Sequence, residues 1–297
     1  MNKISRRRFL MASTAGLAGL SVASKGFGNS YSLANDLMVD KVILGNSGLT
    51  VSRIAMGTGT TGFNQTSSQV RLGMEKFIKI ARHAYERGIR FYDMADVYGS
   101  MPYVAESIKG LPRENLMLLS KVWTYPDSSD RNEPVMKILD RFRREMTTDY
   151  FDVILMHCLQ QGNWNENRKH YMDGLSKAKQ DGIVKAVGIS CHNINALKTA
   201  SESPWVDVIM ARINPFGTLM DGSPDEIKAI LAKAVQNGKG VIGMKIFGEG
   251  KNVTDAERAQ SIQFAVTQGI MQCMTLGFES EAQIDDAISR VMGNVRS

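Results

Sequence analysis

DVILMHCLQQGNWNENRKHYMDGLSKAKQDGIVKAVGIS, residues 152–190, contains one complete strand-helix-strand unit. Its two short apolar runs, residues 153–157 and 186–190, have the length and composition of buried strands. Between them, residues 171–181 have helical periodicity and are followed by Gly182, a residue type that commonly ends a helix. The segment therefore predicts two strands joined by a helix, as in parallel sheets.

The same alternation continues along the chain, which has 297 residues. Expected strands are 54–57, 90–93, 116–121, 153–157, 186–190, 208–213, 241–245 and 271–276. Expected helices are 68–87, 103–108, 133–146, 171–181, 194–200, 225–237, 255–267 and 281–292. Strict alternation favours an α/β fold of the closed (β/α)8 TIM barrel type over an open doubly wound sheet. Ahead of it, two short apolar runs around residues 45–48 predict an N-terminal β-hairpin.

The amino-terminal 35 residues carry most of the net charge. Lys3, Arg6, Arg7, Arg8 and Lys25 supply five of the six net positive charges, and no acidic residue precedes position 36. The remaining chain is nearly neutral. Its charge therefore gives no indication of nucleic-acid binding.

The basic run is followed by a stretch of small and apolar residues, 9–23, that is too short to span a membrane. The order of basic, apolar and small residues is typical of an export signal, and the paired arginines resemble a twin-arginine (Tat) signal. We expect residues 1–35 to be this signal and a linker, recognised by the Tat export machinery, and residues 36–297 to be the barrel domain. The protein would then be periplasmic or otherwise exported. No stable membrane span is expected once the signal is cleaved, although a retained signal could act as an anchor.

Four polar residues lie at or just after the downstream ends of predicted strands: Asp93, Tyr98, Lys121 and His157. The carboxyl ends of the strands in a parallel barrel meet on one face, where active sites are built. A nearby ammonium group favours phenolate, so Lys121 is expected to lower the pKa of Tyr98, while Asp93 balances the lysine charge. An imidazole can orient a carbonyl oxygen. Together these groups predict a site that protonates a carbonyl oxygen.

A metal site is the alternative for one part of this cluster. His157 and Cys158 end one expected strand, and Cys191 and His192 end the next, so they form a possible zinc ligand set. However, neighbouring residues of a strand point to opposite sides, which prevents the four side chains from converging. We therefore expect neither a metal site nor a disulfide between Cys158 and Cys191.

The chain resembles the aldo-keto reductase family from about residue 44 to residue 290. The matching segments are LGNSGLTVSRIAMGTGT at 44–60, Asp-x-Ala-x-x-Tyr-Gly at 93–99, Lys121, Asp-x-Ile-Leu-x-His at 152–157 and Val-Gly-Ile-Ser at 187–190. The resemblance implies a nicotinamide cofactor, NAD or NADP, extended across the C-terminal face of the barrel. It implies Tyr98 as acid/base, tuned by Lys121 and Asp93, with His157 orienting the substrate.

The same resemblance implies a set of cofactor contacts: Gly57, Thr58, Ser190, Cys191, Lys245, Gly277, Phe278, Glu279 and Gln283. Three positions depart from the family pattern. Cys191 stands where Asn is usual, Met210 where Gln is common and Ile213 where Tyr often stacks on the nicotinamide. Residues 277–283 contain no Lys or Arg for a 2′-phosphate, whereas a carboxylate can accept a hydrogen bond from a ribose hydroxyl. The choice between NAD and NADP therefore stays open.

These patterns predict an exported NAD(P)-dependent oxidoreductase that interconverts a carbonyl and an alcohol by hydride transfer. Its substrate would be a small aldehyde, a ketone or a sugar-like molecule. The alternative is a catalytically weak barrel that serves as a binding or regulatory module, which the altered nicotinamide contacts favour. The physiological substrate, the direction of the reaction and the oligomeric state do not follow from the sequence.

Overall fold

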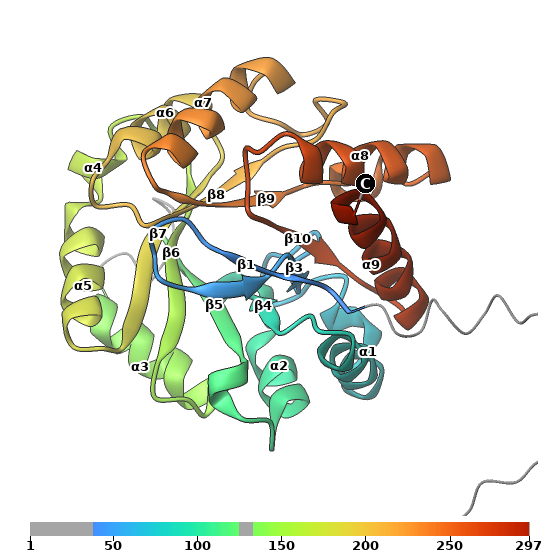
Figure 1. Ribbon diagram of the computed structural model, residues 1–297. Helices are drawn as coiled ribbons and strands as arrows, with labels where there is room; N and C mark the ends of the chain where they lie inside the picture. Colours follow the sequence, from blue (N-terminus) through green and yellow to red (C-terminus); the bar gives the residue numbers. More distant parts are fainter. Residues whose placement is uncertain (1–37, 125–132, 297) are drawn as a thin grey trace, which may run out of the picture. The chain divides into compact units, whose positions relative to one another are not determined.

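The computed structural model describes residues 38–124 and 133–296 (Figure 1). The predicted signal segment, residues 1–35, lies outside them. Eight parallel strands form a closed barrel in the order β10-β3-β4-β5-β6-β7-β8-β9, so the predicted TIM barrel is confirmed. The barrel strands are β3 (Ile54–Gly57), β4 (Phe91–Asp93), β5 (Met117–Trp123), β6 (Phe151–Leu159), β7 (Val184–Cys191), β8 (Val208–Arg212), β9 (Gly240–Met244) and β10 (Cys273–Gly277).

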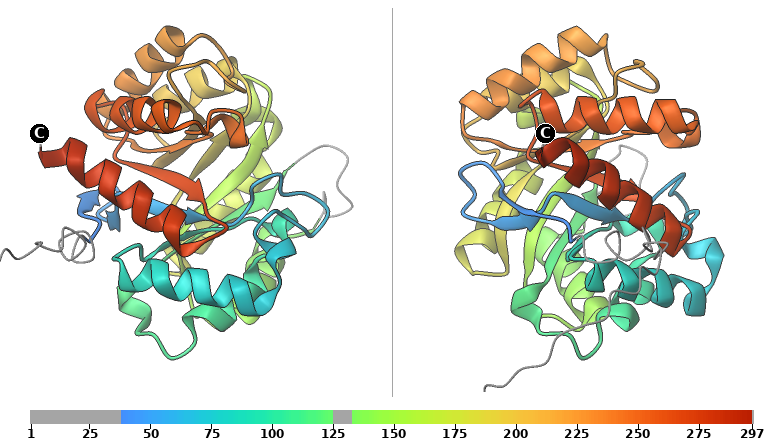
Figure 2. Two further views of the ribbon diagram at one scale, coloured as in Figure 1. Left: turned by 90° about the vertical axis from the view of Figure 1, so that its right-hand side faces the viewer. Right: turned by 45° about the vertical axis from the view of Figure 1, so that its right-hand side comes forward.

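Helices surround the barrel, as Figures 1 and 2 show from three directions. They are α1 (Met74–Glu86), α2 (Met101–Ile108), α3 (Val135–Met146), α4 (Trp164–Asn167), α5 (Lys169–Gln180), α6 (Ile194–Glu202), α7 (Pro224–Gln236), α8 (Asp255–Thr267) and α9 (Glu281–Arg296). Short 3-10 helices are η1 (Val70–Leu72), η2 (Asp96–Tyr98), η3 (Arg113–Asn115) and η4 (Gly248–Gly250). Within the part of the chain that the structure describes, no helix combines the length and apolarity that crossing a bilayer requires.

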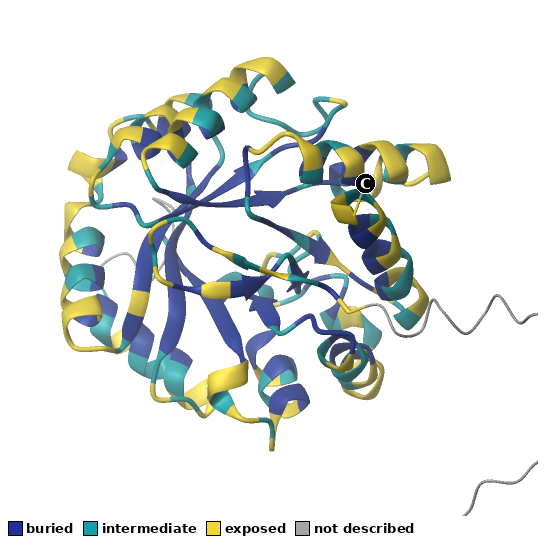
Figure 3. Ribbon diagram, viewed as in Figure 1, coloured by how far each residue is buried: buried dark blue, intermediate teal, exposed yellow. Residues whose placement is uncertain are grey.

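Two hydrophobic layers hold the barrel together. The outer layer lies between strands and helices: α3, for example, buries Ile138, Leu139 and Phe142 along one side, at the spacing of an amphipathic helix. The inner layer fills the barrel with alternate strand residues such as Leu119 and Leu155. Figure 3 shows the result, with buried strands inside and exposed outer helix surfaces.

The predicted hairpin is present and closes the amino-terminal end of the barrel. Strands β1 (Lys41–Ile43) and β2 (Thr50–Ser52) pair antiparallel. The neighbouring Leu44 belongs to the inner core, and a Cβ added at Gly240 would lie 2.6 Å from its Cγ. Because this end is closed by packing, the carboxyl ends of the strands are left to form the site.

Candidate active site

A cavity of about 750 Å³ opens at the carboxyl ends of the strands. This volume is within the range of small-molecule and cofactor sites. Of the predicted site residues, the following line it: Gly57, Asp93, Tyr98, His157, Lys245, Gly277, Phe278, Glu279 and Gln283. The strands β3, β4, β6 and β10, the loops after β4, β9 and β10 and the start of α9 bring these residues together.

Four predicted residues do not line the cavity: Thr58, Lys121, Ser190 and Cys191. The hydroxyl of Thr58 donates to the backbone carbonyl of Asp93 at 2.8 Å, so it holds the strand ends together. Cys191 belongs to the outer core, on the side of β7 that faces the helices. Ser190 is fully buried, and its Oγ has no hydrogen-bond partner among the described residues.

Lys121 and Asp93 form a buried ion pair beneath the cavity. Lys121, which is 1 % exposed, donates to the Asp93 carboxylate and to the carbonyl of Met94 at 2.8 Å. The second carboxylate oxygen of Asp93 accepts a hydrogen bond from Thr275 Oγ1 at 2.8 Å. Burial lowers the pKa of Lys121, while the Asp93 carboxylate opposes this shift. The pair therefore ties β4, β5 and β10 together around one fixed cation.

The Tyr98 side chain lies between this cation and His157. Lys121 Nζ is 4.9 Å from the centre of the Tyr98 ring, and the Tyr98 hydroxyl is 3.4 Å from His157 Nε2. On the other side, the ring packs on backbone at Gly59 and Gly62, where an added Cβ would overlap it. Tyr98 is thus confined in one position, with its hydroxyl directed to the imidazole.

A second ion pair fixes the short helix η2 that carries Tyr98. Arg141, on α3, donates through both terminal nitrogens to the carboxylate of Asp96, each at 2.9 Å. Bidentate pairs of this kind restrict orientation as well as distance. The short helix that carries Tyr98 is therefore held by an ion pair to α3, a helix of the outer layer.

Burial determines the protonation of the two facing groups. It raises the pKa of Tyr98 well above 10, and the Asp93 carboxylate raises it further. The expected net lowering of this pKa is thus wrong, because desolvation outweighs the stabilisation that the Lys121 cation can give to the phenolate. Burial also lowers the pKa of His157 well below 6.5, with Lys121 adding to the shift. At neutral pH the site therefore presents a neutral phenol and a neutral imidazole.

An irregularity at the end of β6 changes what lines the cavity. Cys158 has a left-handed backbone (φ 64°), and the register of β6 with β7 shifts between Met156 and Leu159. As a result His157 and Cys158 both line the cavity, contrary to the alternation expected for neighbouring strand residues. In the chain segments that the structure describes, no cluster of three or more His, Cys, Asp or Glu is arranged to hold a metal ion. All three cysteines are free.

Sequence reasoning missed three of the cavity residues, Gln69, Arg258 and Asp286, and considered His192 only as a possible zinc ligand. Trp123, at the end of β5, packs edge-on against His157 with ring centres 5.2 Å apart. Its position at a strand end was a usable signal. Arg258 and Asp286 are helical residues far from any strand end, so only the fold brings them to the cavity.

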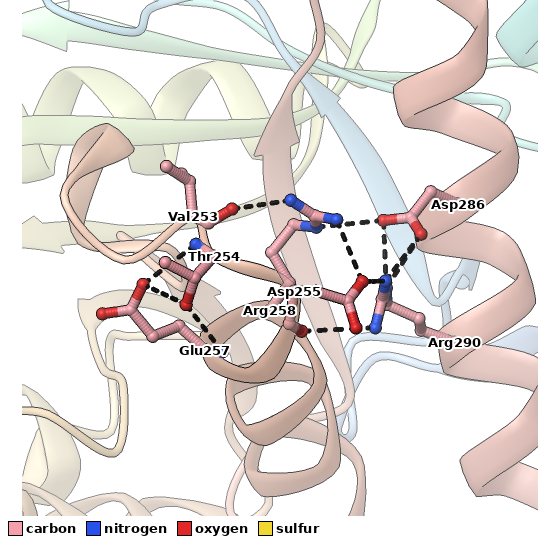
Figure 4. A network of polar contacts seen from close by, with 7 residues as sticks. All are labelled: Val253, Thr254, Asp255, Glu257, Arg258, Asp286 and Arg290. Atoms are coloured by element: carbon pink, nitrogen blue, oxygen red, sulfur yellow. Dashed lines mark hydrogen bonds and ion pairs between the residues drawn. The ribbon is translucent and has the colours of Figure 1, made fainter.

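Arg258 and Asp286 belong to a charged network on α8 and α9 (Figure 4). Arg258 Nε lies 3.2 Å from an Asp286 oxygen, and its other nitrogens contact Asp255 and the carbonyl of Val253. Arg290 also binds both Asp286 and Asp255. Residues 277–283 contain no Lys or Arg, but Arg258 on α8 places a basic side chain at the cavity. This side chain already pairs with the carboxylates of Asp286 and Asp255.

The loop after β9 reaches towards the loop after β3. Lys245, at the start of this loop, pairs with Glu249. The same carboxylate accepts a hydrogen bond from the backbone of Thr61 at 3.3 Å. These contacts join two edges of the cavity between its Tyr98 end and its α8–α9 end.

The protonation of His192 makes stability depend on pH. Burial, with Arg212 and Lys245 nearby, lowers its pKa to about 3. Between pH 6.5 and about 3 the unfolded chain binds a proton that the folded protein does not, which costs up to about 1.4 kcal/mol per pH unit. We expect urea unfolding between pH 7 and pH 5 to show a shallower loss of stability for His192→Phe than for the native protein. The exposed His170, whose pKa is also lowered by partial burial, is changed to Gln for comparison and should alter the slope less than His192→Phe does; an unchanged slope for His192→Phe contradicts the prediction.

Comparison with known proteins gives a family for this chain and finds the same fold in solved structures. The sequence model of the Aldo/keto reductase family matches residues 53–273. L-galactose dehydrogenase of Arabidopsis thaliana is 28% identical over 153 residues, covering 50% of this chain and 47% of the plant protein. Methylglyoxal reductase DkgB of Salmonella typhi is 29% identical over 141 residues, covering 47% of this chain and 51% of its own length. The matched region thus spans about half the length of these relatives.

Solved structures show the same barrel. A putative aldo-keto reductase from Pseudomonas aeruginosa superposes with a TM-score of 0.73 at 19% identity, covering 89% of this chain and 99% of the other. A Bombyx mori aldo-keto reductase in complex with NADP has a TM-score of 0.64 at 19% identity, covering 87% and 92%. With the family model matching well over half of its residues, this chain belongs to the aldo/keto reductase family of oxidoreductases.

Proposed function

We propose that this protein is a nicotinamide-dependent oxidoreductase that interconverts a small carbonyl compound and its alcohol, with Tyr98 as the acid/base. One observation carries the proposal: the Tyr98 hydroxyl faces His157 at 3.4 Å while the buried Lys121–Asp93 pair lies behind its ring. A phenol, an imidazole and a fixed cation at one end of a cavity form a site for a carbonyl oxygen.

The chemistry of these residues follows from their protonation. The neutral phenol of Tyr98 and a nitrogen of the neutral His157 can both donate hydrogen bonds to one carbonyl oxygen. As negative charge develops on that oxygen, Tyr98 transfers its proton. The resulting phenolate is stabilised by Lys121, whose ammonium group is 4.9 Å from the ring centre. In the reverse direction the same phenolate accepts the proton of the alcohol.

Members of this family typically use NAD(P)H, and the cavity fits such a cofactor in most respects. Its volume of about 750 Å³ and its lining, which includes both Tyr98 and residues of α9, are compatible with a dinucleotide, and the buried Ser190 Oγ is a hydroxyl without a partner among the described residues. Lys245 and the backbone around Gly277 would hold the middle and far parts. When bound, the nicotinamide supplies or accepts the hydride. Cys191 faces the outer core, so it is not part of this set.

The charges at the far end favour NADH over NADPH in this proposal. Arg258 is the cation that lines the cavity there, and Asp286 and Asp255 already pair with it. Glu279, which also lines this end, adds a further negative charge. A 2′-phosphate would meet these carboxylates, whereas a ribose hydroxyl could donate a hydrogen bond to one of them.

The relatives support the proposed substrate class. The names methylglyoxal reductase and L-galactose dehydrogenase describe enzymes acting on a dicarbonyl and on a sugar. Small oxygen-rich carbonyl compounds of this kind suit a cavity end lined by Tyr98, His157 and His192.

A binding or regulatory module is the second candidate. The placement of Met210 on the cavity wall and of Ile213 in the outer core favours it, because neither offers the polar or stacking contact usual in the family. A measurement of catalytic turnover distinguishes the oxidoreductase from the binding or regulatory module directly.

Tyr98→Phe removes the proton and leaves the ring. We expect it to lower kcat for aldehyde-dependent oxidation of the reduced cofactor by at least about a hundredfold, because general acid catalysis usually contributes at least this factor to a rate. Cofactor binding, followed by fluorescence titration, should change less than about threefold, since one hydroxyl is lost. Tyr103→Phe, on α2 and packed against Phe77, is the matched control. Equal losses in both variants, or no turnover by the native protein, contradict the proposal.

Asp286→Asn tests the choice of cofactor. Removing this carboxylate should leave Arg258 partly unpaired and raise the affinity for NADPH relative to NADH about tenfold. Fluorescence titration with each reduced cofactor, without a carbonyl substrate, measures the ratio. Asp285→Asn is the control, because this neighbouring carboxylate pairs with His83 and Arg87 instead. An unchanged ratio in Asp286→Asn shows that this network does not select the cofactor.

Export by the Tat route is the remaining part of the proposal. The basic residues Lys3, Arg6, Arg7 and Arg8, followed by the small and apolar residues 9–23, support it. Changing Arg6, Arg7 and Arg8 to Lys keeps the charge but removes the paired arginines. We expect this variant to stay in the cytoplasm with its amino terminus intact, while Lys3→Arg is exported like the native protein. Cell fractionation and mass spectrometry measure both, and normal export of the triple variant would refute a twin-arginine signal.

A further inference from the structure

A second, smaller cavity of about 120 Å³ lies where β5 and β6 end. Cys158, the residue with the left-handed backbone at the end of β6, lines both cavities. Thr124 lines the second cavity, and its hydroxyl donates to the backbone carbonyl of His157 at 2.9 Å. The second cavity therefore adjoins the end of the first cavity that holds Tyr98 and His157.

Arg168 gives the second cavity a positive charge. This half-buried side chain donates through Nε to the carbonyl of Thr124 at 3.1 Å and through one terminal nitrogen to the carbonyl of Asn167 at 3.3 Å. These bonds hold the guanidinium group without neutralising it. Within residues 38–124 and 133–296, no carboxylate pairs with Arg168, and no Asp or Glu lines this cavity. Burial raises the pKa of the Cys158 thiol, so the shared wall is uncharged at pH 7.

The cations of the first cavity are in a different state. Lys245 pairs with Glu249, and Arg258 pairs with Asp286. Their charges are therefore balanced by carboxylates of the protein itself. The charge of Arg168 is not balanced in this way, and partial burial reduces its screening by water. Arg168 is thus available to an anion from solution.

The shape and donors of the second cavity suit a small oxyanion. A guanidinium group presents its N–H groups in a fixed fork that matches the oxygens of a carboxylate or a phosphate. Asn167 donates to Gln161 Oε1 at 3.3 Å, which leaves the amide nitrogen of Gln161 as a further donor beside the cavity. The volume is several times the roughly 30 Å³ that one water molecule occupies in the liquid, so such a group fits.

We propose that the second cavity binds the anionic end of the substrate, a carboxylate or a phosphate, while Tyr98 and His157 bind its carbonyl oxygen. The inference rests on the proposed function, because it places the reacting carbonyl in the first cavity. Since Cys158 is the wall that both cavities share, a short chain beside it can connect the two ends of one molecule. The substrate is then a carbonyl compound with an acidic group a few atoms from the carbonyl carbon.

Two pairs of aldehydes test this class of substrate. The first pair, 4-oxobutanoate and 4-oxobutanamide, has nearly the same shape and differs in the charge of a carboxylate. The second pair, glyceraldehyde 3-phosphate and glyceraldehyde, tests a phosphate. We expect the native enzyme to favour the anionic member of at least one pair by about tenfold or more in kcat/KM, as hydrogen bonds to charged groups usually contribute. The pair that shows the preference identifies the anionic group.

Variants of Arg168 assign the preference to this residue. In Arg168→Gln the preference should fall to within about twofold, because the charge is lost. Arg168→Lys keeps the charge without the fork and should retain part of the preference. Arg144→Gln is the matched control, because Arg144 is an exposed arginine of α3 that lines neither cavity. An equal loss in Arg144→Gln would show that only the net charge of the protein matters and would overturn the proposal.

A binding experiment gives a second readout that does not depend on turnover. Saturation-transfer NMR without cofactor compares 4-hydroxybutanoate with 4-hydroxybutanamide, and glycerol 3-phosphate with glycerol. The native protein should bind the anionic member of at least one pair more strongly, and Arg168→Gln should bind both members equally. Equal binding within both pairs by the native protein overturns the proposal.

The failure of this inference and the failure of the proposed function are distinguishable. Turnover of aldehydes without any preference for an anionic member overturns the subsite but leaves the oxidoreductase intact. A preference that survives in Arg168→Gln overturns the role of this residue. Absence of turnover with every carbonyl refutes the proposed function itself, while the NMR experiment still tests Arg168.

Discussion

The ion pair between Lys121 and Asp93 is the interaction on which the site depends. A lysine that is 1 % exposed at the end of a barrel is stable only with a counter-charge and further hydrogen bonds. Asp93 and the Met94 carbonyl supply them, and Thr275 holds the second oxygen of Asp93. The pair thereby joins three strands and places one positive charge behind the ring of Tyr98.

Around this fixed charge, burial gives the other groups their chemical character. The phenol of Tyr98 stays protonated and the imidazole of His157 stays neutral, so both can donate to one oxygen. In the proposed reaction the cation matters most once the carbonyl oxygen has taken the proton of Tyr98, because it stabilises the phenolate that is left. At the far end of the cavity Arg258 is paired with the carboxylates of Asp286 and Asp255, and we propose that these charges decide between NADH and NADPH.

The sequence was sufficient for the barrel, because strands buried on both faces and helices with one apolar side leave different periodicities. It also placed Asp93, Tyr98 and His157 on the cavity wall, since strand ends converge. The expected direction of the Tyr98 pKa shift was wrong, because the extent to which the phenol is buried is not visible in a sequence. The backbone of Cys158 depends on pairing between β6 and β7, and Arg258 reaches the cavity only through the packing of α8 on α9. Both are properties of the assembled fold.

A double-mutant cycle on Asp93→Asn and Lys121→Met, read in kcat/KM, tests the central claim most directly. If the two residues act as one unit that supports Tyr98, the double variant should lose no more activity than the worse single variant. Losses that multiply would show that each residue acts independently and would contradict this account.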